Sequence, residues 1–167
     1  TALDVLTAVL RDCTVPLLLD ADGLNLIAAH KLSLRECTAP IVITPHAGEM
    51  ARLTGKTIAE ILADPIEICH TFAAENRLIC LLKDAETVVS DGNQIFRNHS
   101  GTPALATAGS GDTLAGILGA LLSDGMEPLK AAYTAAFLHG KCGEEAEKRL
   151  GERPVMARDI SSAISTV

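Results

Sequence analysis

Two kinds of apolar pattern alternate along the chain. Short continuous apolar runs predict strands that are buried on both faces of a sheet, whereas apolar residues recurring every three or four positions predict helices. The continuous runs place strands at 15–20, 40–44 and 78–83. Two shorter runs, 87–90 and 94–97, flank a turn-forming Asp-Gly-Asn sequence and predict an antiparallel hairpin.

Helices are predicted between these strands and over most of the second half of the chain. They span 2–12, 23–31, 47–54, 57–62, 65–76, 111–124, 127–149 and 156–165, with Gly125 and Gly151 as helix stops. Strands that alternate with helices in this way are typical of α/β folds with a mostly parallel central sheet. No linker, repeat or low-complexity tract interrupts residues 1–167, so we expect them to belong to one domain.

Composition excludes several classes of protein. The chain has 167 residues, of which 48% are hydrophobic, enough for one real core. A net charge of -7 argues against a nucleic-acid partner, and three Phe and one Tyr are too few for a base-stacking platform. No apolar run is long enough to span a membrane and no signal-peptide pattern opens the sequence, so we expect a cytoplasmic protein without a membrane partner.

The cysteines do not form a recognisable framework. There are five, an odd number, and no two have the close spacing of zinc ligands. We therefore expect buried thiols in place of disulfides or a zinc site, at Cys13, Cys37, Cys69, Cys80 and Cys142.

A glycine turn opens the helix predicted at 111–124. Gly109 and Gly111 allow the backbone to approach a ligand closely, and the helix start directs unpaired N–H groups at that ligand. A phosphate suits such a site, and the ionised Asp112 beside it is a candidate base for a hydroxyl group. The alternative is that Ser110 and Asp112 only cap the helix, as Ser and Asp often do.

Polar side chains also follow each of the buried strands. In an open α/β sheet the ligand crevice lies outside the carboxyl ends of the strands, so we expect these side chains to converge on one site with the glycine turn. They are Asp20, Asp22 and Asn25 after the first strand, Thr44, His46 and Glu49 after the second, and Lys83 at the end of the third.

Four segments resemble a known family in order and spacing. They are Asp20-Ala-Asp-Gly-Leu-Asn25, Thr44-Pro-His-Ala-Gly-Glu49, Lys83, and Gly101 through Gly116. They resemble the ADP/ATP-dependent NAD(P)H-hydrate dehydratases, a branch of the ribokinase-like superfamily, and the resemblance covers nearly the whole chain. It implies a three-layer α/β/α fold with a mostly parallel central sheet. It also implies that ATP or ADP drives the dehydration of hydrated NADH or NADPH, called NADHX and NADPHX.

The resemblance further implies roles for individual residues. Asp112 is the expected base and a substrate contact, His46 is expected to bind the hydrate, and Glu49 to organise Mg2+ through water. The expected nucleotide contacts are Lys83, Asp84, Ala85, Glu86, Thr87, Gly109, Ser110 and Gly111. The implied cofactors are ADP or ATP with Mg2+, and the implied assembly is a homotetramer.

Simple structural roles compete with these assignments. A His after a strand is often packed or solvated, a Glu in a first helical turn complements the helix dipole, and a Lys at a strand end is often solvated. These alternatives apply to His46, Glu49 and Lys83 in turn. The residues that we regard as candidates for the cleft wall or a Mg2+ network, but equally as helix caps, are Asp20, Asp22 and Asn25.

The chain also departs from the family. Asp84 stands where a glycine usually follows the lysine, which places a negative charge near the expected nucleotide. Other loop changes are Ala47 for Pro, Thr102 for Asn, and Ala104 and Ala108 for Gly. The chain begins where the family's domain is already well advanced. We therefore expect residues 1–167 to be the C-terminal portion of a single domain that binds the hydrate weakly or not at all by itself.

Two other functions are compatible with the same motifs. The Gly-Ser-Gly-Asp turn also suits a kinase of this superfamily that acts on a vitamin precursor or a sugar. A non-catalytic remnant that keeps the scaffold is the third possibility, because of Asp84 and the missing early strands.

Overall fold

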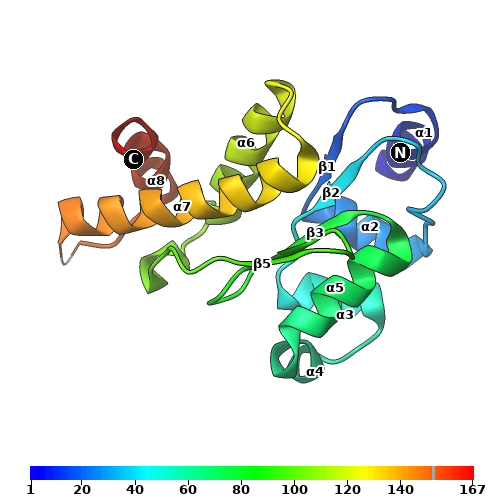
Figure 1. The fold of residues 1–167 in the computed structure, drawn as a ribbon, viewed down its shortest axis with the longest axis horizontal. Helices are drawn as coiled ribbons and strands as arrows, with labels where there is room; N and C mark the ends of the chain where they lie inside the picture. Colours follow the sequence, from blue (N-terminus) through cyan, green and yellow to red (C-terminus); the bar gives the residue numbers. More distant parts are fainter. Residues whose placement is uncertain (152) are drawn as a thin grey trace. The chain divides into compact units, whose positions relative to one another are not determined.

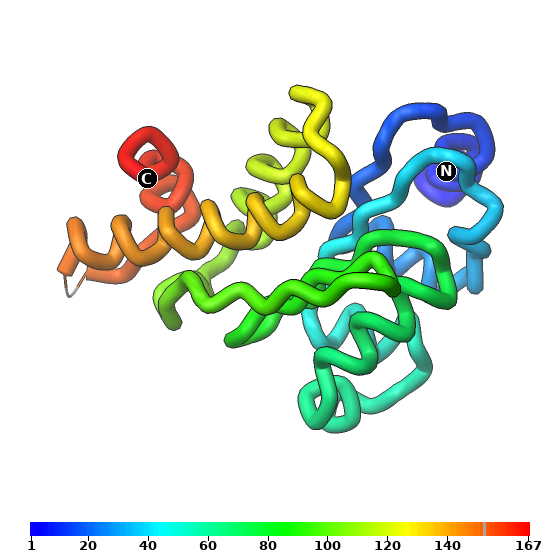
Figure 2. Tube along the Cα trace, in the orientation of Figure 1, coloured from blue at the N-terminus to red at the C-terminus, as the bar shows by residue number. Residues whose placement is uncertain are grey.

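Five strands form one sheet in the spatial order β1-β2-β3-β4-β5 (Figure 1). β1 (Leu17–Leu19), β2 (Ile41–Ile43) and β3 (Ile79–Leu82) pair in parallel. β4 (Val88–Ser90) and β5 (Ile95–Arg97) continue the sheet as the expected antiparallel hairpin, which the trace in Figure 2 follows in green. The predicted strands are therefore confirmed.

The parallel strands are shorter than the apolar runs suggested. Proline cannot donate a hydrogen bond to a neighbouring strand, and Pro16, Pro40 and Pro45 lie beside β1 or β2. The pairing of β1 with β2 accordingly starts at Leu17, whose N–H donates to the carbonyl oxygen of Pro40 at 2.8 Å.

This computed structural model describes residues 1–151 and 153–167. The chain forms two compact units, Thr1–Arg97 and Asn98–Val167. The first unit contains the sheet, and the second is helical.

Five helices accompany the sheet in the first unit: α1 (Ala2–Asp12), α2 (Asp22–His30), α3 (Ala47–Thr54), α4 (Ile58–Ala63) and α5 (Pro65–Asn76). Each contributes a side chain to the same core, namely Leu10, Leu24, Met50, Ile61 and Phe72. These pack with alternate strand residues such as Ile41 and Ile43, while Val42 between them points to the opposite face and is also buried. Burial on both faces explains why the strands are continuously apolar.

The second unit consists of α6 (Ser110–Ser123), α7 (Pro128–Leu150) and α8 (Ala157–Ser162), with 3-10 turns at Pro103–Leu105 and Ala163–Thr166. The helix predicted at 156–165 is thus divided into an α-helix and a 3-10 turn. The core of the second unit is formed by Cys142, Ala146, Val155, Ile160 and Ala163. The segment that contains Ser100 and Leu105 packs closely against two glycines of α7. A Cβ on Gly140 would overlap with Ser100, and a Cβ on Gly143 would overlap with Leu105.

All five cysteines are free thiols, as expected. Cys69, Cys80 and Cys142 are buried, but Cys13 and Cys37 are only half-buried, so the expectation of burial was wrong for these two. A hydrogen bond with Cys69 and complete burial raise the pKa of the Cys80 thiol well above its usual value. Within the described residues, no helix is both long and apolar enough to cross a membrane.

The hairpin depends on Gly92. Its φ of +83° is unfavourable for other residues, and a Cβ at this position would overlap with the Ala74 backbone on α5. We expect Gly92→Ala to lower the free energy of unfolding by about 2–5 kcal/mol, through backbone strain and steric overlap together.

Gly55→Ala is the matched control in the same unit. Gly55 also has a positive φ, +72°, but nothing lies within 4 Å of its missing Cβ. We expect a cost of about 1–2 kcal/mol, from strain alone. Chemical denaturation of both variants measures the difference, and equal losses would show that the contact with α5 is not limiting.

Candidate functional site

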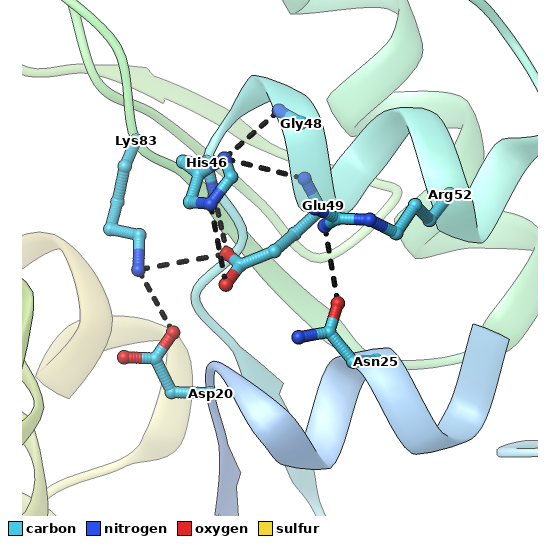
Figure 3. Close-up of polar contacts among 7 residues, drawn as sticks. All are labelled: Asp20, Asn25, His46, Gly48, Glu49, Arg52 and Lys83. Atoms are coloured by element: carbon cyan, nitrogen blue, oxygen red, sulfur yellow. Dashed lines mark hydrogen bonds and ion pairs between the residues drawn. The ribbon is translucent and has the colours of Figure 1, made fainter. Parts of the chain in front are cut away.

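The ends of β2 and β3 continue their pairing past the last regular strand residues. Lys83 N–H donates to the carbonyl oxygen of Pro45 at 2.7 Å, and His46 and Lys83 form an isolated parallel bridge. The side chains of His46 and Lys83 therefore extend from neighbouring segments at the same edge of the sheet (Figure 3). This confirms the expectation that these two strand ends converge.

Lys83 lies between two carboxylates. Its Nζ is 2.8 Å from Asp20 Oδ1, beyond β1, and 3.9 Å from Glu49 Oε2 on α3 (Figure 3). The side chains are 21%, 16% and 7% exposed for Lys83, Asp20 and Glu49. The alternative of a solvated lysine was therefore wrong, because the ammonium group balances the charge of carboxylates from two other segments.

His46 and Glu49 form a reciprocal cap at the start of α3. His46 Nδ1 accepts hydrogen bonds from the N–H groups of Gly48 at 2.9 Å and Glu49 at 3.3 Å, and Glu49 Oε2 accepts from His46 N–H at 2.9 Å. Because Nδ1 is an acceptor, the neutral ring carries its proton on Nε2. Nε2 lies 3.5 Å from Glu49 Oε1, and the ring is 53% exposed. His46 is thus a helix cap that also presents a donor to solvent.

Asp22 and Asn25 do not join this group. α2 has Ala21 at its N-cap and no side-chain cap, so the capping alternative was wrong for Asp20 and Asp22. Asn25 Oδ1 instead accepts from Arg52 Nη1 at 3.1 Å, which links α2 to α3 (Figure 3). Ala21, directly after Asp20, has a φ of +47°, a strained value for alanine at the turn out of β1.

The residues after Lys83 form the exposed loop between β3 and β4. Thr87 Oγ1 donates to the carbonyl oxygen of Asp84 at 3.5 Å. Glu86 pairs with Arg97 at the end of β5, which ties the loop to the hairpin. The loop is thus ordered by its own contacts, and its assignment to the nucleotide, with Ala85, stays a prediction.

In the second unit, α6 begins at Ser110 and its N-cap is Gly109, with a φ of +81° and no side-chain cap. The alternative that Ser110 and Asp112 only cap this helix was therefore wrong. Ser110 Oγ instead shares a hydrogen bond with His139 Nε2 at 3.1 Å. Sequence reasoning missed His139, since no motif surrounds it and its partner lies 29 residues away.

Two amides remain available at the start of α6. Ser110 N–H donates to Thr107 O at 3.2 Å, and Thr113 N–H donates to Gly109 O at 3.1 Å. Within the described part of the chain, this leaves the N–H groups of Gly111 and Asp112 without an acceptor. Asp112 is exposed, and its Oδ2 lies 3.9 Å from where a Cβ would stand on Gly109. A carboxylate and two free amides thus flank the same glycine turn.

Where the structure describes them, the acidic side chains do not form a metal site by themselves. Among the residues described, no three His, Cys, Asp or Glu side chains are grouped so that they could hold a metal ion. Glu49 already accepts from His46 N–H and faces Lys83, so its carboxylate is occupied by groups of the protein. A contact of Glu49 with Mg2+ through water stays a prediction.

The ion pair between Lys83 and Asp20 can be tested for its effect on stability. Asp20→Asn keeps the shape of the side chain but removes the charge nearest to a mostly buried ammonium group. We expect it to lower the free energy of unfolding by about 1–3 kcal/mol. In the control, Asp12→Asn, the partner Arg11 and the acid are 72% and 62% exposed, so we expect less than about 1 kcal/mol. Equal small changes in chemical denaturation would contradict the structural importance of the pair.

Comparison with known proteins identifies the family. The family model described as NAD(P)H-hydrate dehydratase matches residues 2–166. The bifunctional NAD(P)H-hydrate repair enzyme Nnr of Moorella thermoacetica is 44% identical over 94% of this chain, which spans 30% of that protein. The ADP-dependent (S)-NAD(P)H-hydrate dehydratase of Neisseria meningitidis is 37% identical over 90% of this chain, which spans 52% of it.

Solved structures agree. The ADP/ATP-dependent NAD(P)H-hydrate dehydratase of Bacillus subtilis, co-crystallised with ATP/Mg2+, superposes with a TM-score of 0.79 at 30% identity, over 90% of this chain and 53% of that one. A ribokinase-like superfamily protein of Enterococcus faecalis superposes with a TM-score of 0.79 at 29% identity, over 99% of this chain and 57% of that one. The expected ribokinase-like α/β fold is confirmed, and the chain spans from about a third to just over a half of the length of these relatives. The chain belongs to the NAD(P)H-hydrate dehydratase family.

Proposed function

We propose that the protein containing this chain dehydrates NADHX or NADPHX to NADH or NADPH at the expense of ADP or ATP. The two units would then belong to one domain. The observation that carries the proposal is the start of α6, where the amides of Gly111 and Asp112, which have no acceptor among the described residues, adjoin the Asp112 carboxylate. Family membership supports this reaction over others that use the same turn.

The chemistry explains why a phosphoryl donor is needed. Hydroxide is a poor leaving group, so the ring hydroxyl of the hydrate is first converted into a phosphate ester. Asp112 takes the hydroxyl proton while the oxygen attacks the terminal phosphorus of the nucleotide, and the bond to the bridging oxygen breaks. The amides of Gly111 and Asp112 stabilise the charge on the transferring group. The ring nitrogen then expels phosphate, and loss of a proton from the neighbouring carbon restores the double bond.

The first unit would bind the two reactants. His46 Nε2–H, on the half-exposed side of the capped ring and 3.5 Å from Glu49 Oε1, would bond to the hydrate. Lys83 through Thr87 would hold the adenosine phosphate portion, with Lys83 kept in place by Asp20. The negative charge of Asp84 would weaken nucleotide binding in comparison with relatives that have glycine there.

Further properties follow from the family resemblance. We propose Mg2+ as the ion that accompanies the nucleotide, supported by the ATP/Mg2+ co-crystal of the Bacillus subtilis relative. Glu49 would contact it through water. A cytoplasmic homotetramer is the proposed assembly.

Asp112→Asn in the full-length protein tests the role of the base. The amide keeps the size of the side chain but cannot accept the hydroxyl proton, so we expect kcat to fall by about 100- to 10,000-fold. Recovery of NADPH absorbance from NADPHX with ADP or ATP measures it. Asp124→Asn is the control, because Asp124 is an exposed carboxylate at the other end of α6. An unchanged rate for Asp112→Asn would remove this residue as the base.

The same assay separates the alternatives. Release of phosphate together with NADPH supports the dehydratase. A stable phosphorylated product would favour a kinase, and absence of both turnover and nucleotide binding would favour a non-catalytic remnant.

His46→Asn separates the two functions of this side chain. Asparagine is a good N-cap whose Oδ1 can replace Nδ1 as the acceptor, but it removes the Nε2 donor. We expect the KM for the hydrate to rise about tenfold, the effect of losing one hydrogen bond, while stability is unchanged. His46→Ala loses the cap as well and should also lower the free energy of unfolding by about 1 kcal/mol. If His46→Asn leaves KM unchanged, His46 is a cap and nothing more.

A further inference from the structure

Ser110 and His139 form a polar pair inside the second unit. Their Oγ and Nε2 atoms lie 3.1 Å apart, and the residues are only 7% and 9% exposed. Ser110 is the first residue of α6, and His139 lies in the middle of α7. A hydrogen bond shielded from water is stronger than an exposed one, so this bond holds the two side chains together firmly.

The surroundings on α7 make His139 unusual. The other buried residues of this helix, which is described in full, are Leu129, Ala131, Ala132, Ala135, Ala136, Gly140, Cys142, Gly143 and Ala146. Among the buried residues of α7, His139 is therefore the one whose side chain is a polar ring. The helix is held just before His139, because Asn98 Nδ2 donates to Ala136 O at 3.2 Å and Ser100 Oγ donates to Phe137 O at 3.0 Å. The backbone that carries the His139 ring is therefore held in place, and the ring can hold Ser110 in turn.

The glycine turn needs such a contact. Ser110 lies between Gly109 and Gly111, and glycines restrict the backbone less than other residues. Ser110 N–H donates to Thr107 O, and Thr113 donates to Gly109 O, but all of these residues belong to the turn and the first turn of α6. The bond to His139 joins the turn to another helix, so it fixes the direction in which the amides of Gly111 and Asp112 point.

We propose that His139 is a positioning residue for phosphoryl transfer, which acts through Ser110 on the amides of Gly111 and Asp112. This rests on the proposed function. His139 touches neither reactant. Its effect arises because amides that stabilise a transferring phosphoryl group act only when they are already oriented, and a misplacement of about 1 Å can cost about 100-fold in rate.

The test compares substitutions of His139 in the full-length protein. His139→Leu removes the hydrogen bond at similar volume, whereas His139→Gln keeps a side-chain amide that can reach Ser110. We expect His139→Leu to lower kcat by about 10- to 100-fold and to weaken ADP binding, with the KM for the hydrate unchanged. His139→Gln should recover most of the loss. His30→Leu, at an exposed histidine of α2, is the matched control.

Ser110→Ala identifies the route, because it disturbs packing little and keeps the proposal testable if His139→Leu does not fold. We expect it to lower kcat as much as His139→Leu does, and the double variant to be no slower than either. Ser123→Ala, at an exposed hydroxyl of the same helix, should have no effect. Wild-type kcat in folded Ser110→Ala, or additive losses in the double variant, would overturn the proposal.

Nucleotide binding separates failure of this inference from failure of the proposed function. If the wild-type protein binds ADP in calorimetry but does not dehydrate NADPHX, the proposed reaction is wrong. Weaker ADP binding by His139→Leu and Ser110→Ala would still support the positioning role. ADP binding equal to that of the wild type in both variants would overturn it.

Discussion

The arrangement of the first unit depends on the backbone bond from Lys83 to Pro45. Pro45 cannot donate a hydrogen bond, but its carbonyl oxygen accepts one, and this carries the pairing of β2 and β3 past their ends. Without that bond Lys83 would belong to the loop that follows it. With it, the ammonium group reaches Asp20 across the ends of three neighbouring strands. One main-chain contact therefore determines which side chains meet.

Helices and strands could be predicted from the sequence more fully than the contacts between side chains. Residues 47–54 form the predicted helix because His46 and Glu49 cap its start and Gly55 ends it, and all of these signals are local. The pairing of Lys83 with Asp20 spans 63 residues, and nothing near either residue specifies the partner. Strand ends were overestimated, since apolar runs extend into prolines that cannot join the ladder.

The glycine turn was recognised, but its orientation was not predictable. Ser110 suggested a hydroxyl that faces a ligand or caps a helix, whereas it points into the unit toward His139. The distinction depends on which face of α6 packs against α7, and the small residues of α7 that permit this contact have no chemistry of their own. The amides of Gly111 and Asp112 lie in the first turn of α6, which has no preceding helical turn to accept their hydrogen bonds.

The double acceptor role of His46 Nδ1 has a thermodynamic consequence. An imidazole held by two main-chain N–H groups has already given up most of its rotational freedom before any partner arrives. A molecule that accepts a hydrogen bond from Nε2 would therefore restrict the ring little further. The entropic penalty of binding at this position would be small.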